Sequence, residues 1–195
     1  MAEVKIIVKS FLWRKNDIYN TSPNVVLIRD GGKNTVVDPG MNREILIDSL
    51  KKENLRPEDI DYVVLTHYHL DHSLLTGIFE NAIVFDDTEY YNFNGEIIHH
   101  KGIVFDTNIQ IIKTPGHDAY HCSPMVDTEK GKICIAGDVF FWEDKQEQKT
   151  DRESLMNLPD PYMKDKEKLL ESRKKILENA DYIIPGHGEM FKVSK

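Results

Sequence analysis

Four side chains of types that bind metal ions lie within six residues of this sequence. Segment 66–72 reads Thr-His-Tyr-His-Leu-Asp-His and directly follows the apolar run 62–65. In a turn that leaves a buried strand, the first two histidines can converge from one side. The aspartate and the last histidine, at the start of the next helix, can converge from the other. This density exceeds what one tetrahedral site takes from so short a segment, so two adjacent metal ions are expected. The candidates are His67, His69, Asp71 and His72.

Three later segments repeat this layout, with a ligand-type side chain at the end of an expected strand. They offer His117 after strand 109–113, Asp138 after strand 132–136 and His187 after strand 182–184. Glycine directly precedes each of the three, and a residue without a β-carbon lets the backbone pass close to an occupied site. Each segment alone is a weak signal, because Pro-Gly before histidine is often a simple turn. Together with segment 66–72 they indicate one metal centre.

Strands and turns must bring these distant segments together. Short apolar runs bounded by turn residues predict strands at 4–9, 24–29, 35–38, 62–65, 82–85, 103–106, 109–113, 123–127, 132–136 and 182–184. Apolar residues at helical spacing predict helices at 43–53 and 165–180. Residues 143–163 are polar and charged with two prolines, so we expect a long loop there. That loop is the candidate for a lid that sets specificity.

The order of these motifs along the chain resembles that of the metallo-β-lactamase superfamily. The resemblance runs from Val-Asp-Pro-Gly at 37–40, through segment 66–72, to the three later candidates. It implies an α/β (α+β) fold, a four-layered αββα sandwich, as a single domain over residues 1–195. It also implies a first metal ion on His67, His69 and His117, a second on Asp71, His72 and His187, and Asp138 as the bridge between them.

Such a centre would be hydrolytic. Two divalent metal ions can share one hydroxide, which would attack a carbonyl or phosphoryl centre without a serine or cysteine nucleophile. Asp71, orienting that hydroxide, and Asp138, bridging the ions, are the expected catalytic residues. Zinc is the default metal for a histidine-rich site, and iron or manganese would also be accepted.

Neighbouring polar residues are candidates for orienting the ligands. Asp38 ends its expected strand and could hold a ligand imidazole through the free ring N–H, or simply cap a turn. Asp118 is a second candidate for the same role. His121 could face substrate, with a solvated loop histidine as the alternative.

Three aromatic residues directly follow the expected bridging aspartate. Phe140, Phe141 and Trp142 could wall an apolar substrate pocket, stack the bases of a single-stranded RNA, or belong to the core.

Composition narrows the classes of partner. The chain of 195 residues has a net charge of −8, which gives no basic field for attracting a phosphate backbone. Its two cysteines cannot form a disulfide framework. No apolar stretch approaches the ~20 residues of a membrane span, so we expect a cytoplasmic protein that does not bind membranes.

Within the superfamily, the C-terminal third resembles the compact group of metallo-β-lactamase-domain-containing protein 1. That resemblance rests on Ile-Ala-Gly-Asp-Val-Phe at 135–140, Glu-Ser-Arg-Lys-Lys at 171–175 and Asp-Tyr-Ile-Ile-Pro-Gly-His-Gly at 181–188. It implies a metal-dependent endoribonuclease. The acidic charge favours instead a small-molecule hydrolase acting on a thioester, lactone or related acyl compound. β-Lactam hydrolysis and a non-catalytic metal-binding module are further alternatives, and we expect a monomer or homodimer.

Overall fold

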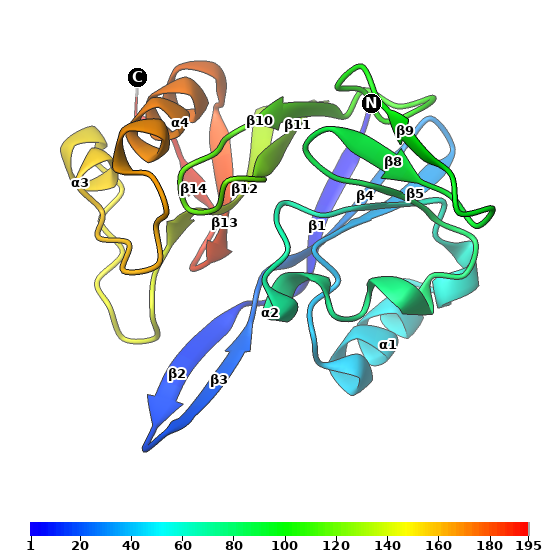
Figure 1. The fold of residues 1–195 in the computed structure, drawn as a ribbon, viewed down its shortest axis with the longest axis horizontal. Helices are drawn as coiled ribbons and strands as arrows, with labels where there is room; N and C mark the ends of the chain where they lie inside the picture. Colours follow the sequence, from blue (N-terminus) through cyan, green and yellow to red (C-terminus); the bar gives the residue numbers. More distant parts are fainter. Residues whose placement is uncertain (195) are drawn as a thin grey trace.

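Most strands of the computed structural model, which describes residues 1–194, form two sheets (Figure 1). The first contains β1 (Glu3–Val8), β4 (Val25–Asp30), β5 (Lys33–Val37), β6 (Tyr62–Val64), β7 (Ile83–Phe85), β8 (Glu89–Tyr91) and β9 (Ile97–His99), in that order. The second contains β10 (Gln110–Lys113), β11 (Cys122–Thr128), β12 (Gly131–Phe141), β13 (Tyr182–His187) and β14 (Phe191–Lys192), in that order. The helices are α1 (Arg43–Lys52), α2 (Leu70–Ser73), α3 (Arg152–Met156) and α4 (Lys166–Asn179).

Three apolar clusters separate the layers. One joins residues of both sheets, such as Val64 and Phe85 with Val126 and Ile135. A second lies between the second sheet and α3 and α4, and a third lies between the first sheet and α1. The helices therefore cover the outer faces of two packed sheets (Figure 1). This is the predicted αββα sandwich of the α/β class, with one apolar core between each pair of adjacent layers.

Alternation along the strands assigns each residue to its layer. In β4, Val26 and Ile28 join the cluster between the sheets, whereas their neighbours Val25 and Leu27 face α1. Successive strand side chains point to opposite faces. Because both faces of β4 are covered, its residues 25–28 are all apolar, without a polar residue between them.

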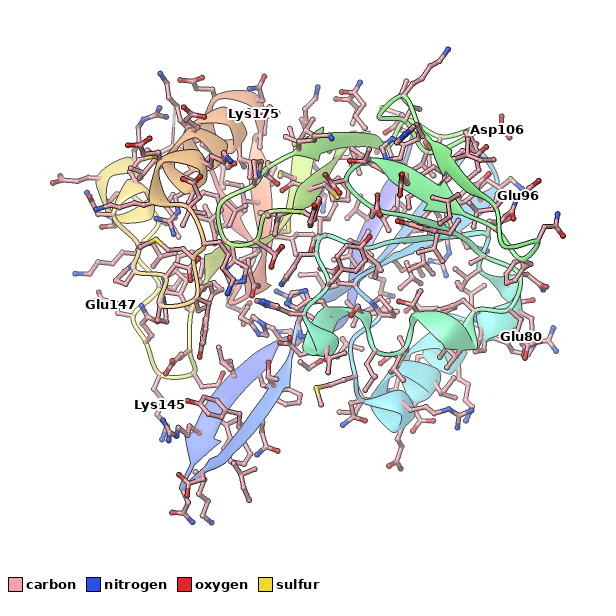
Figure 2. The ribbon with its side chains drawn as sticks, viewed as in Figure 1. Glu80, Glu96, Asp106, Lys145, Glu147 and Lys175 are labelled. Carbon is pink, nitrogen blue, oxygen red and sulfur yellow. The ribbon has the colours of Figure 1, made fainter. Side chains whose placement is uncertain are left out.

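Most charged residues lie on the outside of these layers. Glu80, Lys145 and Lys175 are exposed and point away from the ribbon (Figure 2). Among the described residues, no helix is long and apolar enough to cross a membrane.

The predicted helices at 43–53 and 165–180 are confirmed as α1 and α4. Each begins at a polar cap: Asn42 Oδ1 accepts from Ile45 N, and Asp165 Oδ1 accepts from Lys168 N. A side-chain acceptor at this position satisfies an N–H that the first turn leaves without a partner.

Several predicted strands need correction. Residues 103–106 form no strand: Ile103 makes one isolated bridge to Gln110, and the chain then turns through Asp106 at φ 56°. Strand β12 does not end at Ala136 but continues through Asp138, because Gly137 at φ 52° lets the pairing with β13 shift register. The loop 143–163 contains the helix α3.

A hairpin that the sequence did not reveal extends from the body of the molecule. Strands β2 (Phe11–Lys15) and β3 (Ile18–Ser22) pair only with each other and project below the two sheets (Figure 1). Their apolar residues are interrupted by charges, so the segment gave no clear strand pattern.

Gly116 shows how closely α4 lies against the loop before His117. It has φ 137°, and a β-carbon there would overlap the backbone of Leu169. Substitution of Gly116 by alanine should therefore lower the free energy of unfolding by about 3 kcal/mol or more, since neither backbone can yield without breaking contacts.

Gly77→Ala is the matched control, because a β-carbon at Gly77 would enter open space, with no described atom of another segment within 4 Å. Urea denaturation of both variants measures the difference. Equal stability of the two would mean that the Gly116 approach does not constrain the fold.

Candidate metal centre

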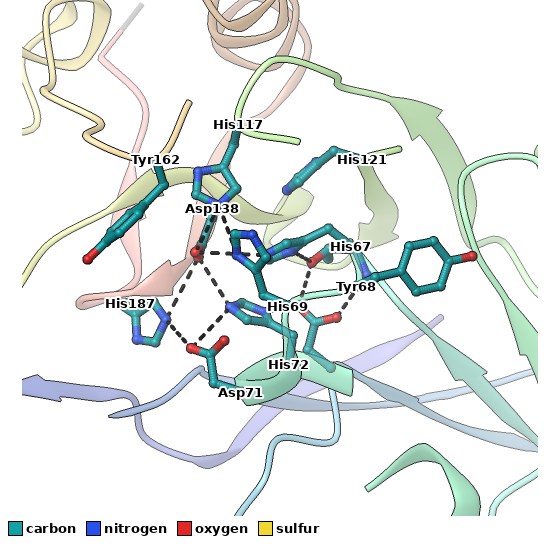
Figure 3. A network of polar contacts seen from close by, with 12 residues as sticks. His67, Tyr68, His69, Asp71, His72, His117, His121, Asp138, Tyr162 and His187 are labelled. Carbon is teal, nitrogen blue, oxygen red and sulfur yellow. Dashed lines mark hydrogen bonds and ion pairs between the residues drawn. The ribbon is translucent and has the colours of Figure 1, made fainter. Parts of the chain in front are cut away.

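The candidate ligands meet at one edge of the two sheets. His67 follows β6 and His117 follows β10, while Asp138 and His187 lie on β12 and β13. Strands β12 and β13 are parallel, as are β5 and β6, so their carboxyl ends come to the same edge. The short helix α2 adds Asp71 and His72 from the side (Figure 3).

Seven side chains form two groups in which potential ligand atoms lie within 4.8 Å of one another. The first group is His67, His69, His117 and Asp138, and the second is Asp71, His72 and His187. All seven residues expected from the sequence are thus brought together, in the partition that the family resemblance implies.

Asp138 faces both groups, one oxygen to each. Its Oδ2 lies 3.5 Å from His117 Nε2 and 3.9 Å from His67 Nε2. Its Oδ1 lies 3.4 Å from His72 Nε2 and 3.9 Å from His187 Nε2. A β-carbon on Gly186 would overlap Asp138 Oδ1, so glycine at this position leaves room for the carboxylate.

Asp38 orients two of the imidazoles. Its Oδ2 lies 2.8 Å from His72 Nδ1 and accepts a hydrogen bond from Thr66 Oγ1 at 2.7 Å. Because that hydroxyl proton is committed to Asp38, Thr66 Oγ1 accepts from His67 Nδ1, 3.0 Å away. The Nε2 lone pairs of His67 and His72 are thereby directed into the centre. Thr66 was not singled out in the sequence.

Asp160, not Asp118, contacts the third imidazole. Asp160 Oδ2 lies 2.8 Å from His117 Nδ1, and both side chains are fully buried. Asp118 instead accepts from the backbone N–H of Tyr120, so its expected role belongs to Asp160. Asp160 stands between two prolines in the polar loop, where sequence offers no periodic signal that would place it.

Helix α4 holds both segments that carry this pair. Ser172 Oγ donates to Pro115 O at 2.7 Å, next to the His117 loop. The buried Arg173 donates through Nη1 to Leu158 O at 2.8 Å, near Asp160, and through Nε to Val139 O. The Glu-Ser-Arg segment noted in the sequence therefore holds in place the backbone segments next to His117, Asp138 and Asp160.

The residues present fit a metal centre. His67 Nε2, His72 Nε2 and Asp138 Oδ1 are buried and have no hydrogen-bond partner. Buried polar atoms are costly when unpaired, and these three converge while the opposite nitrogens of both rings are tied to protein. Imidazole nitrogen and carboxylate oxygen are the ligand types that zinc and related divalent ions accept.

Burial and charge set different protonation states across the two groups. Burial lowers the pKa of His67 well below its ordinary value, which keeps that ring neutral. Burial also opposes charge on His72, but the carboxylates of Asp138 and Asp38 outweigh it and raise the pKa of His72. Burial would raise the pKa of Asp71, yet its bond to His187 and the charge of His72 bring that pKa to about 2.

A cavity of about 490 Å³ opens onto the ligands. Its floor includes His69, Asp71, Asp138 and His187, and its walls are apolar: Leu12, Tyr19, Met41, Leu70, Phe141 and Tyr162. Thr21 completes the lining, and no lysine or arginine of the described chain contributes to it.

The three aromatic candidates separate according to strand face. Phe141 lines the cavity and packs edge-on against His117, with ring centroids 5.8 Å apart. Phe140 is fully buried in the cluster beneath α4, and Trp142 packs against Phe191 in the same cluster. Of the three, only Phe141 fits the pocket role; the other two fit the core alternative.

His121 neither lines the cavity nor lies in a solvated loop. It is fully buried behind His67, with the two rings stacked at a centroid distance of 5.1 Å. Its Nδ1 contacts Thr114 Oγ1 at 3.0 Å, and burial lowers its pKa to about 3. His121 is therefore a neutral packing partner of a ligand imidazole.

The predicted lid contributes less to the cavity than the unpredicted hairpin does. From residues 143–163 only Tyr162 lines the cavity, whereas Leu12, Tyr19 and Thr21 all come from β2 and β3. The backbone N–H of Tyr162 donates to Asp160 Oδ1 at 2.8 Å, so one carboxylate fixes both a ligand and the wall beside it.

Removing Asp160 tests the role assigned to it. Asp160→Ala leaves His117 Nδ1 without an acceptor, so zinc affinity should fall by about 10- to 100-fold. Asp118→Ala is the matched control and should bind zinc as the unaltered protein does. Competition against a chromophoric chelator measures both, and an equal effect of the two substitutions would contradict the assignment.

Acid should displace metal from the two groups at different pH. His72 has a raised pKa and takes up a proton at Nε2 first as the pH falls, whereas His67, with its lowered pKa, stays free to bind. Metal bound by Asp71, His72 and His187 should therefore leave at a higher pH than metal bound by the first group. Zinc retention measured across a pH series checks this, and loss of all metal in one step would argue against it.

Comparison with known proteins agrees with this architecture. The model of the metallo-β-lactamase superfamily matches residues 18–91. An uncharacterised protein of Caenorhabditis elegans is 32% identical over 187 residues, covering 90% of this chain and 50% of that protein, so the chain spans half its length. Metallo-β-lactamase domain-containing protein 1 of Xenopus laevis is 31% identical over 189 residues, covering 92% of this chain and 76% of that protein. N-acyl homoserine lactonase of Bacillus cereus is 29% identical over 46% of this chain and 42% of that enzyme.

The fold is likewise shared with a solved structure. A metallo-β-lactamase family protein from Thermus thermophilus superposes with a TM-score of 0.67 at 18% identity, over 97% of this chain and 75% of that one. At this identity the likeness concerns the fold alone. The identity with the Xenopus protein extends over most of both chains and carries the family assignment. The chain therefore belongs to the metallo-β-lactamase superfamily.

Proposed function

We propose that this protein uses two divalent metal ions, with zinc as the default, to hydrolyse a neutral acyl compound such as a thioester or lactone. The observation that carries the proposal is the apolar cavity that opens directly onto both ligand groups. Apolar walls with a few convergent polar groups are the usual composition of a small-molecule site.

The chemistry of the two groups supports a pair of ions. Each group offers three side chains of its own, and Asp138 turns one oxygen toward each. When bound, such ions supply Lewis acidity that makes water nucleophilic near neutral pH and polarises the attacked oxygen. Asp71 lines the cavity together with Asp138, and its carboxylate is available there to orient a water molecule.

The cavity walls support an acyl substrate with an apolar portion. Phe141 and Tyr162 lie side by side at a ring-centroid distance of 6.2 Å, and Leu12, Met41 and Leu70 add aliphatic surface. Burying such a portion stabilises the complex by roughly 25 cal/mol per Å² and excludes water from the reacting carbonyl. The partial similarity to an N-acyl homoserine lactonase points to the same substrate class.

RNA cleavage is the alternative expected from the sequence, and the cavity supports it less. Proteins that bind single-stranded nucleic acid combine stacking aromatics with cationic side chains that track the phosphates. The cavity offers the aromatics Tyr19, Phe141 and Tyr162, but its described lining includes no lysine or arginine. A net charge of −8 adds repulsion rather than attraction for phosphate.

A small molecule is accordingly the proposed partner. Cytoplasmic location, absence of membrane binding, and the monomeric or homodimeric state stay predictions from the sequence, as does the lid role of residues 143–163.

Turnover assays with a matched set of substrates test the proposal. Zinc-loaded protein should hydrolyse thioesters or lactones that carry an apolar acyl chain, with kcat/KM at least ~10-fold above that for acetyl analogues. It should leave a labelled single-stranded RNA intact. Asp138→Ala should abolish turnover and reduce the bound metal, because both groups lose their shared carboxylate. RNA cleavage that requires Asp138 and stops with chelator would overturn the acyl assignment.

A further inference from the structure

A small number of contacts with the body of the molecule, here called tethers, hold the β2–β3 hairpin in position. Its two strands form a separate sheet, with register from Phe11↔Ser22 to Lys15↔Ile18. An isolated two-stranded hairpin is marginally stable at best in water. The place of its cavity residues, Leu12 and Tyr19, is therefore set by the contacts that fasten the hairpin to the body.

Two of those tethers lie on opposite strands. On β2, Leu12 N donates to Asp144 Oδ1 at 3.1 Å, and Asp144 N donates to Leu12 O at 2.8 Å. On β3, the half-buried Thr21 donates through Oγ1 to Asp71 Oδ2 at 2.9 Å. The first tether reaches an exposed loop, whereas the second reaches a candidate metal ligand.

The oxygen that accepts from Thr21 is the one that faces the second ligand group. Asp71 Oδ2 lies 3.4 Å from His187 Nε2 and 3.9 Å from His72 Nε2. A carboxylate oxygen has two acceptor sites, so it can hold the hydroxyl of Thr21 and still bind a cation. The hydroxyl thus fixes the rotation of the carboxylate without occupying the position of a metal.

We propose that Thr21 is a positioning residue that couples the seating of the β2–β3 hairpin to metal binding by Asp71, His72 and His187. Seating the hairpin aligns Asp71 Oδ2 and raises the affinity of this group. By reciprocity, a metal on this group stabilises the seated hairpin by the same factor. The apolar wall of the cavity is therefore completed when the second group is loaded. The inference rests on the metal-binding part of the proposed function and not on its substrate.

Zinc itself is the probe in the experiment. Thr21→Val removes the hydroxyl while keeping the shape, and Thr21→Ser keeps the hydroxyl. Chelator competition gives the zinc affinity of each group, with the second group identified by its loss in His187→Ala. Thr21→Val should weaken the second group by about 10-fold and leave the first unchanged, and Thr21→Ser should behave as the unaltered protein does.

Amide hydrogen exchange over residues 11–22 supplies the reciprocal readout. Protection of the hairpin should rise when zinc is added to the unaltered protein and to Thr21→Ser, and this rise should disappear in Thr21→Val. A purely structural role for Thr21 would change protection equally with and without zinc. It would also leave the difference between the two zinc affinities unaltered.

Asp144→Ala tests the coupling without touching the centre, because it removes only the side-chain tether on β2. It should raise exchange in the hairpin and also lower the affinity of the second group. A looser hairpin with unchanged zinc affinity would overturn the inference, as would a Thr21→Val protein that retains both affinities. Failure of the proposed metal centre is distinguishable, because the unaltered protein and Asp138→Ala would then bind zinc equally.

Discussion

A buried carboxylate that faces imidazoles from two sides is the constraint on which this structure depends. Asp138 is 6% exposed, and its two oxygens face different ligand groups. Burial would raise the pKa of Asp138, but His72, His187 and His67 outweigh it and hold that pKa well below the ordinary value. Charge at this depth persists only if the rings that face it keep their orientation, and the scaffold holds His67, His72 and His117 through their Nδ1 atoms.

Two carboxylates, Asp38 and Asp160, orient these three rings, and each belongs to a different part of the scaffold. Asp38 leaves β5 and orients His72 directly and His67 through Thr66. Asp160 comes from the loop before α4 and orients His117. The parallel strands β5 and β6 bring Asp38 and the histidine motif to the same edge, so the orientation of His67 and His72 is set within the first sheet. The orientation of His117 depends on α4, which holds the loop of Asp160 against the second sheet.

The surroundings of the candidate centre favour the proposed class of substrate over RNA. The floor of the cavity carries imidazoles and carboxylates, its walls are aromatic and aliphatic, and its described lining includes no lysine or arginine. The proposed neutral substrate with an apolar portion would contact those walls, whereas the described lining offers a phosphodiester no lysine or arginine. The hairpin supplies part of the cavity wall and, through Thr21, also contacts the candidate ligand Asp71, so the cavity and the candidate metal centre share one element.

The sequence alone determined the candidate ligands and much of the secondary structure, because both depend on local pattern. The histidine motif after an apolar run, the Gly-His and Gly-Asp pairs and the two periodic helices are readable within a few residues. The resemblance of the motifs to the metallo-β-lactamase superfamily then implied the αββα fold and the grouping of the candidate ligands. Tertiary structure alone decided what stands behind and around them. Asp160 and Thr21 carry no local signal, since their roles arise from contacts with residues 43 and 50 positions away. Strand pairing likewise decided which neighbouring aromatic lines the cavity: Phe141 faces His117, and Phe140 packs under α4, because adjacent strand residues point to opposite faces.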